Sequence, residues 1–137
     1  MTGIQTFNVE IEGLVPIVMH NGQLCDPFNY YAKELKKLTS KKTKTEDDLR
    51  QMMRVEWDGS LYLDGEGRVA MPADNVLAMI QAGARKFRLG PQVEPGVFLD
   101  SNWCEFSYDG PKDLDKLYED SRFVFRKRAV FESKKGL

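Results

Sequence analysis

Residues 60–87, SLYLDGEGRVAMPADNVLAMIQAGARKF, place a predicted β-hairpin directly before a predicted helix. Two short strand-like runs flank the tetrapeptide DGEG at 64–67, which is a strong hairpin signal. Pro72 and Asp74 then open a helix, and Gly90 ends it after a basic last turn. The apolar face of this helix carries Val76, Leu77, Ile80, Ala84 and Phe87. A hairpin followed by an amphipathic helix is typical of an α+β fold.

Residues 6–19, TFNVEIEGLVPIVM, begin with strict alternation of apolar and polar side chains. Phe7, Val9 and Ile11 fall on one face of an extended chain, and polar residues fall on the other. This period of two predicts a half-buried strand. Gly13 and Pro16 interrupt the alternation and predict a bend before a second apolar piece at 17–19.

Two amphipathic helices are predicted between this strand and the hairpin. Asp26-Pro27 is a helix-start signal, and the stripe after it predicts a helix over 27–38. Thr45 and Asp48 have the spacing of a capping box, which predicts a helix over 46–57. The two apolar stripes are Phe28, Tyr31, Leu35 and Leu38, and then Leu49, Met52, Met53 and Trp57.

The patterns after residue 90 are weaker. Residues 96–110 predict one or two strands before a turn at 109–111, and residues 111–120 predict a short helix. In residues 122–132, RFVFRKRAVFE, the alternation of Phe123 and Phe125 predicts a further strand. Together these elements predict one α+β domain over residues 1–137, with a mainly antiparallel sheet and packed helices.

The composition indicates a folded soluble protein without metal or cofactor. Of the 137 residues, 42% are hydrophobic and 30% charged, which suits one core and argues against disorder. The formal net charge of -1 means that any nucleic-acid binding must rest on local patches. Cys25 and Cys104 form no CxxC motif, which argues against a structural zinc site. Without a predicted signal peptide or membrane span, we expect a cytoplasmic protein.

Residues 67–88, GRVAMPADNVLAMIQAGARKFR, resemble a segment of the RAMP-type, Cas7-like RNA-recognition proteins. In that family a strand ends in Ile-Pro, a small-residue turn follows, and a striped helix ends in Arg. The matching positions are Val69, Met71-Pro72, Leu77, Ala84 and Arg85. The family's turn is Gly-Ser-Ser and often approaches RNA, whereas residues 73–75 here are Ala-Asp-Asn. The resemblance implies a ferredoxin-like, RRM-like core.

Residues 13–37, GLVPIVMHNGQLCDPFNYYAKELKK, resemble the opening of small uncharacterised phage and prophage proteins with an MHNG-x-L-x-DP stretch. Such proteins are expected to continue beyond a C-terminal basic strand, so the resemblance implies a member truncated at its C-terminus. For a phage-encoded chain, the expected location is the host cytoplasm. The resemblance implies no established activity.

Basic residues gather in two places and are the candidate nucleic-acid contacts. Such clusters can follow a phosphate backbone, and aromatic residues beside them can stack on bases. The alternative is a solvated helix face and loop balanced by the acidic residues at 46–48, with Phe123 and Phe125 in the core. The candidate contacts are Lys33, Lys36, Lys37, Lys41, Lys42 and Lys44, and then Arg126, Lys127 and Arg128.

His20 and Asp26 are the weak candidates for catalysis. His20 could act as a general base, and Asp26 as an acid or metal ligand in a metal-dependent endoribonuclease. The alternative is purely architectural, with Asn21-Gly22 as a tight turn and Asp26 as the cap of the 27–38 helix. One histidine and scattered acids do not form a complete catalytic set, so an enzyme is not the leading prediction.

Three functional hypotheses follow from these patterns. The leading one is a non-enzymatic RAMP-like module that binds single-stranded RNA or DNA through the basic loop and strand. The second is a phage-type protein-interaction or assembly module that docks on a host complex or forms a homo-oligomer. The third is the endoribonuclease that uses Asp26. Clustering of lysines favours the first, and near-neutral net charge favours the second.

Overall fold

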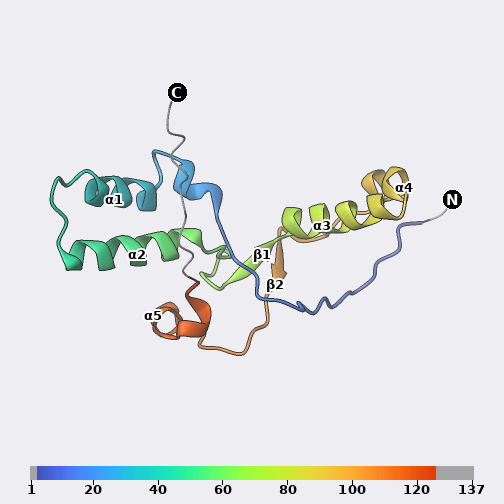
Figure 1. Cartoon of the computed structure of the whole chain (residues 1–137). Coiled ribbons are helices and arrows are strands. Elements are labelled where there is room, and N and C mark those ends of the chain that lie inside the picture. The colour runs from blue at the N-terminus through green and yellow to red at the C-terminus, as the bar shows by residue number, and fades with distance from the viewer. Residues whose placement is uncertain (1–2, 126–137) are drawn as a thin grey trace, which may run out of the picture.

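The computed structural model of the chain describes residues 3–125. The molecule is elongated, with a helical hairpin at one end, a small sheet in the middle and two helices at the other end (Figure 1). The strands are β1 (Ala70–Pro72) and β2 (Trp103–Glu105), and the 3-10 helices are η1 (Gly22–Cys25) and η2 (Ser121–Phe123). The α-helices are α1 (Tyr30–Thr39), α2 (Glu46–Ser60), α3 (Ala73–Lys86), α4 (Gly90–Gly96) and α5 (Leu114–Glu119).

The two strands pair antiparallel in the middle of the molecule. Ala70 lies opposite Glu105, and Pro72 lies opposite Trp103. Helices and this two-stranded antiparallel sheet confirm an α+β fold. The predicted hairpin forms before β1, with a single bridge between Leu63 and Val69. The sheet formed by the described residues therefore has only two strands, and it is much smaller than the mainly antiparallel sheet that was predicted.

Helix α2 confirms the helix predicted over 46–57. The Thr45 hydroxyl accepts from the Asp48 amide at 3.2 Å, and the Asp48 carboxylate accepts from the Thr45 amide at 3.0 Å, which completes the capping box. The helix continues to Ser60, and α1 packs against it antiparallel (Figure 1). The short helix predicted within 111–120 is also confirmed as α5.

Helix α1 starts later than the predicted residue 27. Asn29 is its N-cap, because the side-chain oxygen of Asn29 accepts from the Tyr31 amide at 2.9 Å. The prediction that Asp26 caps this helix is wrong. The Asp26 carboxylate instead accepts from the Phe28 amide, which closes a turn before the helix. Phe28 is therefore outside the helix and 81% exposed.

Helix α3 begins at Ala73 as predicted, but Gly90 does not end it. The Arg88 and Leu89 amides donate to Arg85 and Ala84, respectively, in the pattern of a Schellman motif. This motif places Arg88 in the left-handed region, with φ at 61°. Gly90 is instead the buried first residue of α4.

The predicted N-terminal strand is wrong for the described residues. Residues 3–19, called the N-terminal arm below, are extended but belong to no strand. Phe7, Val9 and Ile11 are 75%, 76% and 54% exposed. A strand needs a neighbour for its backbone amides and carbonyls, and no strand of residues 3–125 pairs with the arm.

The prediction of a strand over 122–132 falls partly outside the described residues. Its first part is wrong, because Phe123 ends η2. Residues 126–132 lie outside the described range. The buried apolar side chains of the described residues are few: Leu38, Leu61, Ala70, Ala73 and Leu117.

Candidate functional site

The stretch around His20 connects the arm to the helical hairpin. Asn21 caps η1 with its side-chain oxygen and donates its side-chain amide to the Leu61 carbonyl at 2.9 Å. Its backbone amide donates to Ser60 at 3.1 Å. Gly59 permits this close approach, because a Cβ there would lie 2.5 Å from Leu24 Cδ2. The stretch is thus an anchor on the C-terminal end of α2.

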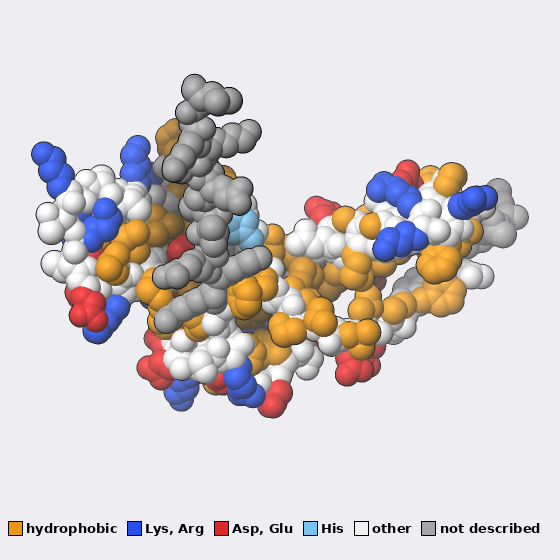
Figure 2. Space-filling view, in the orientation of Figure 1, with side chains coloured by type: hydrophobic (Ala, Val, Ile, Leu, Met, Phe, Trp, Pro, Cys, Tyr) orange, Lys and Arg blue, Asp and Glu red, His pale blue; other side chains and the backbone are white. Residues whose placement is uncertain are grey.

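His20 and Asp26 make no shared site. His20 is exposed, at the surface in Figure 2, and its carbonyl accepts a hydrogen bond from the Tyr62 hydroxyl at 3.1 Å; its imidazole makes no hydrogen bond to another residue of the described range 3–125. The Asp26 carboxylate accepts from the Phe28 amide at 2.9 Å. Residues 3–125 contain no group of three or more histidine, cysteine, aspartate or glutamate side chains that could hold a metal ion. Nothing in this geometry favours the endoribonuclease.

Of the predicted lysines, Lys33, Lys36 and Lys37 lie on α1, and Lys41, Lys42 and Lys44 lie in the loop between α1 and α2. Five of the six are exposed, and Lys44 is half-buried. Several of them have partners within the hairpin: Lys37 pairs with Glu34, and Lys33 lies 6.0 Å from the centre of the Phe28 ring. No carboxylate of the described residues forms an ion pair with Lys36 or Lys42. Lys36 near the end of α1 and Lys42 in the loop are therefore available to bind a phosphate.

Lys41 has a structural partner. Its ammonium lies 2.5 Å from the Asp48 carboxylate, so it links the loop to the first turn of α2. This hydrogen bond, with those from Thr45, lowers the pKa of Asp48 from 3.8 to about 2. In the same way, the hydrogen bond to Glu34 raises the pKa of Lys37. The sequence identified the charges but not which of them are neutralised.

The second predicted basic cluster, Arg126, Lys127 and Arg128, lies outside the described residues. The aromatic residues before it have separate roles. Phe123 is half-buried, packs edge-on to Tyr108 at 5.5 Å, and accepts a hydrogen bond on its carbonyl from Trp57 at 3.0 Å. Phe125 is exposed. Phe123 is thus a packing residue and not a stacking platform.

Arg54 was not predicted from the sequence, although it joins two distant helices. Its guanidinium lies 4.8 Å from the Tyr118 ring centre and 5.6 Å from that of Trp57. It also bonds Asp58 at 2.9 Å and Asp115 at 2.6 Å, and the bond to Asp58 is the main cause of its raised pKa. The spacing of Arg54 and Asp58 was a usable signal, but Asp115 is 61 residues away. This cluster fastens α5 to α2.

The largest unpredicted feature is exposed apolar surface. Among residues 3–125, nineteen large hydrophobic side chains are exposed, and eight of them belong to the N-terminal arm. Apolar side chains occupy much of the span between the two ends of the molecule in Figure 2, and basic side chains lie at both ends and along the lower edge of this view. The eight are Ile4, Phe7, Val9, Ile11, Leu14, Val15, Ile17 and Val18. Contiguous exposure of this kind makes the arm a candidate interaction surface.

The total accessible area supports the same conclusion. The chain exposes 12050 Å², whereas a compact monomer of 15.7 kDa exposes about 7,300 Å². The fourteen residues outside the described range contribute at most about 2,300 Å², the value for a fully extended chain of that length. An excess of about 2,500 Å² therefore belongs to the described residues.

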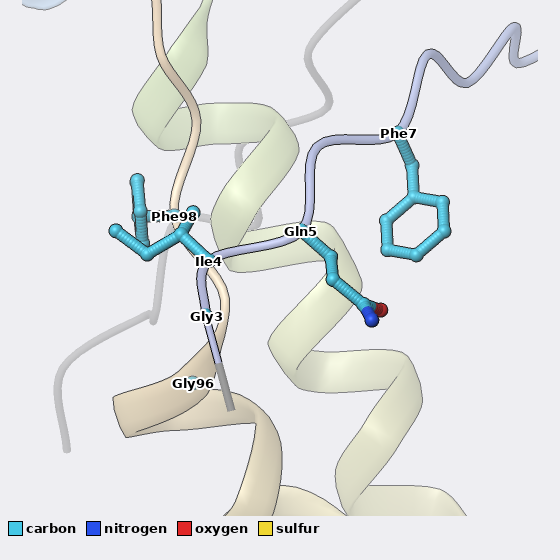
Figure 3. A pocket seen from close by; sticks show the side chains of 6 residues that line it. All are labelled: Gly3, Ile4, Gln5, Phe7, Gly96 and Phe98. Carbon is cyan, nitrogen blue, oxygen red and sulfur yellow. The ribbon is translucent and has the colours of Figure 1, made fainter. Parts of the chain in front are cut away.

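Two open hollows lie beside the arm and α3. One, of about 380 Å³, is lined by the arm and by the residues at the end of α4 (Figure 3). The other, of about 510 Å³, lies between the start of α3 and residues 98–103. Phe98 lines both, and Asp74 is the only charged residue in either lining.

Comparison of the chain with protein-family models, curated proteins and solved structures gave no match. The RAMP-type and phage resemblances therefore stay predictions, as does the cytoplasmic location. Among the described residues, every helix is too short or too polar to cross a bilayer. The functional argument rests on the geometry above.

Proposed function

We propose that this chain is a protein-interaction or assembly module that binds another protein subunit through its N-terminal arm. The observation that carries the proposal is the row of exposed apolar side chains on the arm. Covering a large apolar side chain contributes about 1.5–3 kcal/mol, so the arm holds enough apolar surface to drive association.

The backbone of the arm supports the same proposal. Between residues 3 and 19, no backbone hydrogen bond to another described residue is formed. Ordering an extended residue costs about 1–2 kcal/mol, and only paired amides and buried side chains offset this cost. A partner that supplies a strand beside the arm would provide both.

We also propose that the arm forms a further strand of the predicted antiparallel sheet. The ferredoxin-like, RRM-like core implied by the RAMP-type resemblance needs more strands than β1 and β2. The alternating residues 6–12 have the pattern of such a strand. We expect the arm to become a strand when a partner lies beside it.

Hydrogen exchange of the dilute, unassembled chain tests the proposal. Amides of residues 4–19 are expected to exchange within seconds, whereas those in the middle of α2 exchange slowly and serve as the internal reference. A dye that fluoresces on apolar surfaces should bind the same sample. Slow exchange throughout the arm in a monomer would overturn the proposal, since the arm would then be covered within its own chain.

Nucleic-acid binding at the α1–α2 hairpin is a second candidate. It is favoured by the exposed side chains of Lys36 and Lys42. Neither ammonium group forms an ion pair with a carboxylate of the described residues. Contacts of this kind hold phosphates without reading bases, so binding should be weakly sequence-selective. The proposed ligand is single-stranded RNA or DNA.

A polarisation titration with single-stranded RNA, single-stranded DNA and duplex at two salt concentrations tests this candidate. Replacing Lys36 and Lys42 together with alanine should weaken binding and reduce the salt slope by roughly 1.5. Lys41 is left intact because its bond to Asp48 is structural. Lys112→Ala, which removes a lysine beside Tyr108, is the control and should change nothing. Binding that is absent, or unaffected by the double substitution, removes this candidate.

A further inference from the structure

We infer that the subunit bound by the N-terminal arm is a second copy of this chain, and that the two arms pair as antiparallel strands about Val9. This inference rests on the proposed function and names its partner. It is argued from the arm's own residue order, its exposure and the area that the chain leaves uncovered.

The apolar face of the arm is complementary to itself. With a two-fold axis at Val9, Val9 lies opposite its own copy, and Phe7 lies opposite Ile11 in both directions. Opposed side chains in an antiparallel pair share one face of the sheet, so three apolar pairs stack on one side. The three residues are 75%, 76% and 54% exposed in the single chain.

The polar face selects the same register. With the axis at Val9, Glu10 lies opposite Asn8, and Glu12 lies opposite Thr6. Moving the axis to Glu10 opposes two identical carboxylates, which is destabilising. Moving it to Asn8 leaves Ile11 opposite Gln5. A two-fold axis that passes between two adjacent residues would place the apolar side chains of one arm opposite the polar side chains of the other.

A two-stranded ribbon needs further cover for its apolar face, because an isolated hairpin-like pair is marginal in water. The hollow at the end of α4 offers it. Ile4 and Phe7 of the arm line this hollow together with Phe98, as Figure 3 shows. Phe98 is 64% exposed, so its ring is available to the ribbon.

The uncovered area agrees with a homodimer. Obligate homodimers bury about 2,000–5,000 Å² in total, or about 1,000–2,500 Å² on each chain. The excess of about 2,500 Å² on the described residues is large enough to supply that interface. It exceeds the roughly 800 Å² per partner of a standard transient complex.

The first experiment measures the mass of the full chain by sedimentation from low to high micromolar concentration. The unaltered chain should form a dimer, and Val9→Lys should weaken it about 30-fold or more, since two lysines then meet on an apolar face. Asn8→Lys is the matched control, because its new charge lies opposite Glu10 and the dimer should persist. Circular dichroism should show unchanged helix content in both variants.

The second experiment tests the register by cross-linking. With Cys25 and Cys104 replaced by serine, Val9→Cys should form a disulfide-linked dimer on mild oxidation, because directly opposed residues have Cα atoms about 4.5–5.5 Å apart. Asn8→Cys should not form one. Residue 8 of one chain lies opposite residue 10 of the other, so the two new cysteines are offset by two residues along the ribbon. Equal cross-linking by both variants would overturn the register, and a dimer indifferent to Val9→Lys would overturn pairing through the arm.

Failure of this inference differs from failure of the proposed function. A chain that stays monomeric at every concentration, with fast-exchanging arm amides, overturns the homodimer and leaves an assembly module with a different partner. A monomer with slow-exchanging arm amides overturns both.

Discussion

The α1–α2 hairpin and the N-terminal arm carry equally clear apolar patterns, yet the hairpin covers part of its apolar stripe within the chain, whereas the stripe of the arm stays exposed. Leu38 in α1 is 5% exposed because α2 lies against it. Val9 in the arm is 76% exposed because no described strand lies beside it. A local sequence pattern predicts which side chains will be buried, but it does not identify the element that buries them.

The sharpest test of this contrast is to remove one apolar side chain from each region. Leu38→Ala should lower the free energy of unfolding by about 2–4 kcal/mol, since it leaves a cavity. Val9→Ala, measured in the dilute unassembled chain, should change it by less than about 0.5 kcal/mol. Urea denaturation followed by circular dichroism gives both values. Equal losses would show that the arm is packed within a single chain.

A second test compares two helix glycines. At Gly59 a Cβ would lie 2.5 Å from Leu24 Cδ2 and 3.0 Å from Tyr31 Cβ, whereas at Gly83 it would meet nothing within 4 Å. Gly59→Ala should therefore destabilise the chain by about 1–3 kcal/mol. Gly83→Ala should stabilise it by about 0.5–1 kcal/mol, because alanine is the better helix former.

Thermal melts of both glycine variants give the comparison. A stabilised Gly59→Ala would mean that the stretch around η1 does not press on α2, and the anchoring of the arm to the hairpin would need another explanation.

The end of α3 offers a smaller effect. Arg88 adopts a φ of 61°, where a side chain costs about 1–2 kcal/mol and glycine costs little. Arg88→Gly should raise the free energy of unfolding by about 0.5–1 kcal/mol after the added entropy of the unfolded chain is subtracted. Arg88→Ala retains the strain and is the control. No gain from glycine would indicate that the Schellman turn is not formed in solution.

The smallest expected effect is a pH dependence of the hairpin. The pKa of Asp48 is about 2 in the folded chain and 3.8 ordinarily, so its stabilisation is complete above about pH 4 and disappears as the pH falls through 2. The pKa values of Asp64 and Asp120 are also lowered, so acid affects other turns as well. The difference in pH-dependent stability between the unaltered chain and Asp48→Asn gives the contribution of the hairpin alone.

Thermal melts between pH 5 and pH 2 would show this difference as a shallower acid slope in Asp48→Asn. Identical slopes in the two proteins would contradict the bond between Lys41 and Asp48.

The sequence predicted best what depends on neighbouring residues. The capping box at Thr45 and Asp48 fixed the start of α2, and the DGEG turn placed the bridge between Leu63 and Val69. The start of α1 was misplaced because Asp26-Pro27 forms a turn as readily as a helix start.

What the sequence missed depends on residues that meet only in space. Arg54 and Asp115 are brought together by the packing of α5 on α2. The arm's alternation predicted a strand, but pairing is non-local and the pattern does not reveal a missing neighbour. The lysine cluster was visible as a count of charges, whereas the bond of Lys41 to Asp48 needs the hairpin to form.

The extended arm also has a consequence for the lifetime of the protein. A protease must bind its target as an extended strand of several residues, and exposed segments without hydrogen bonds are cut first. If the arm binds a partner as proposed, a copy in the complex covers this strand, and a copy without a partner exposes it. Cleavage within residues 4–19 would then remove surplus copies selectively, so that the amount of chain in a cell follows the amount of complex.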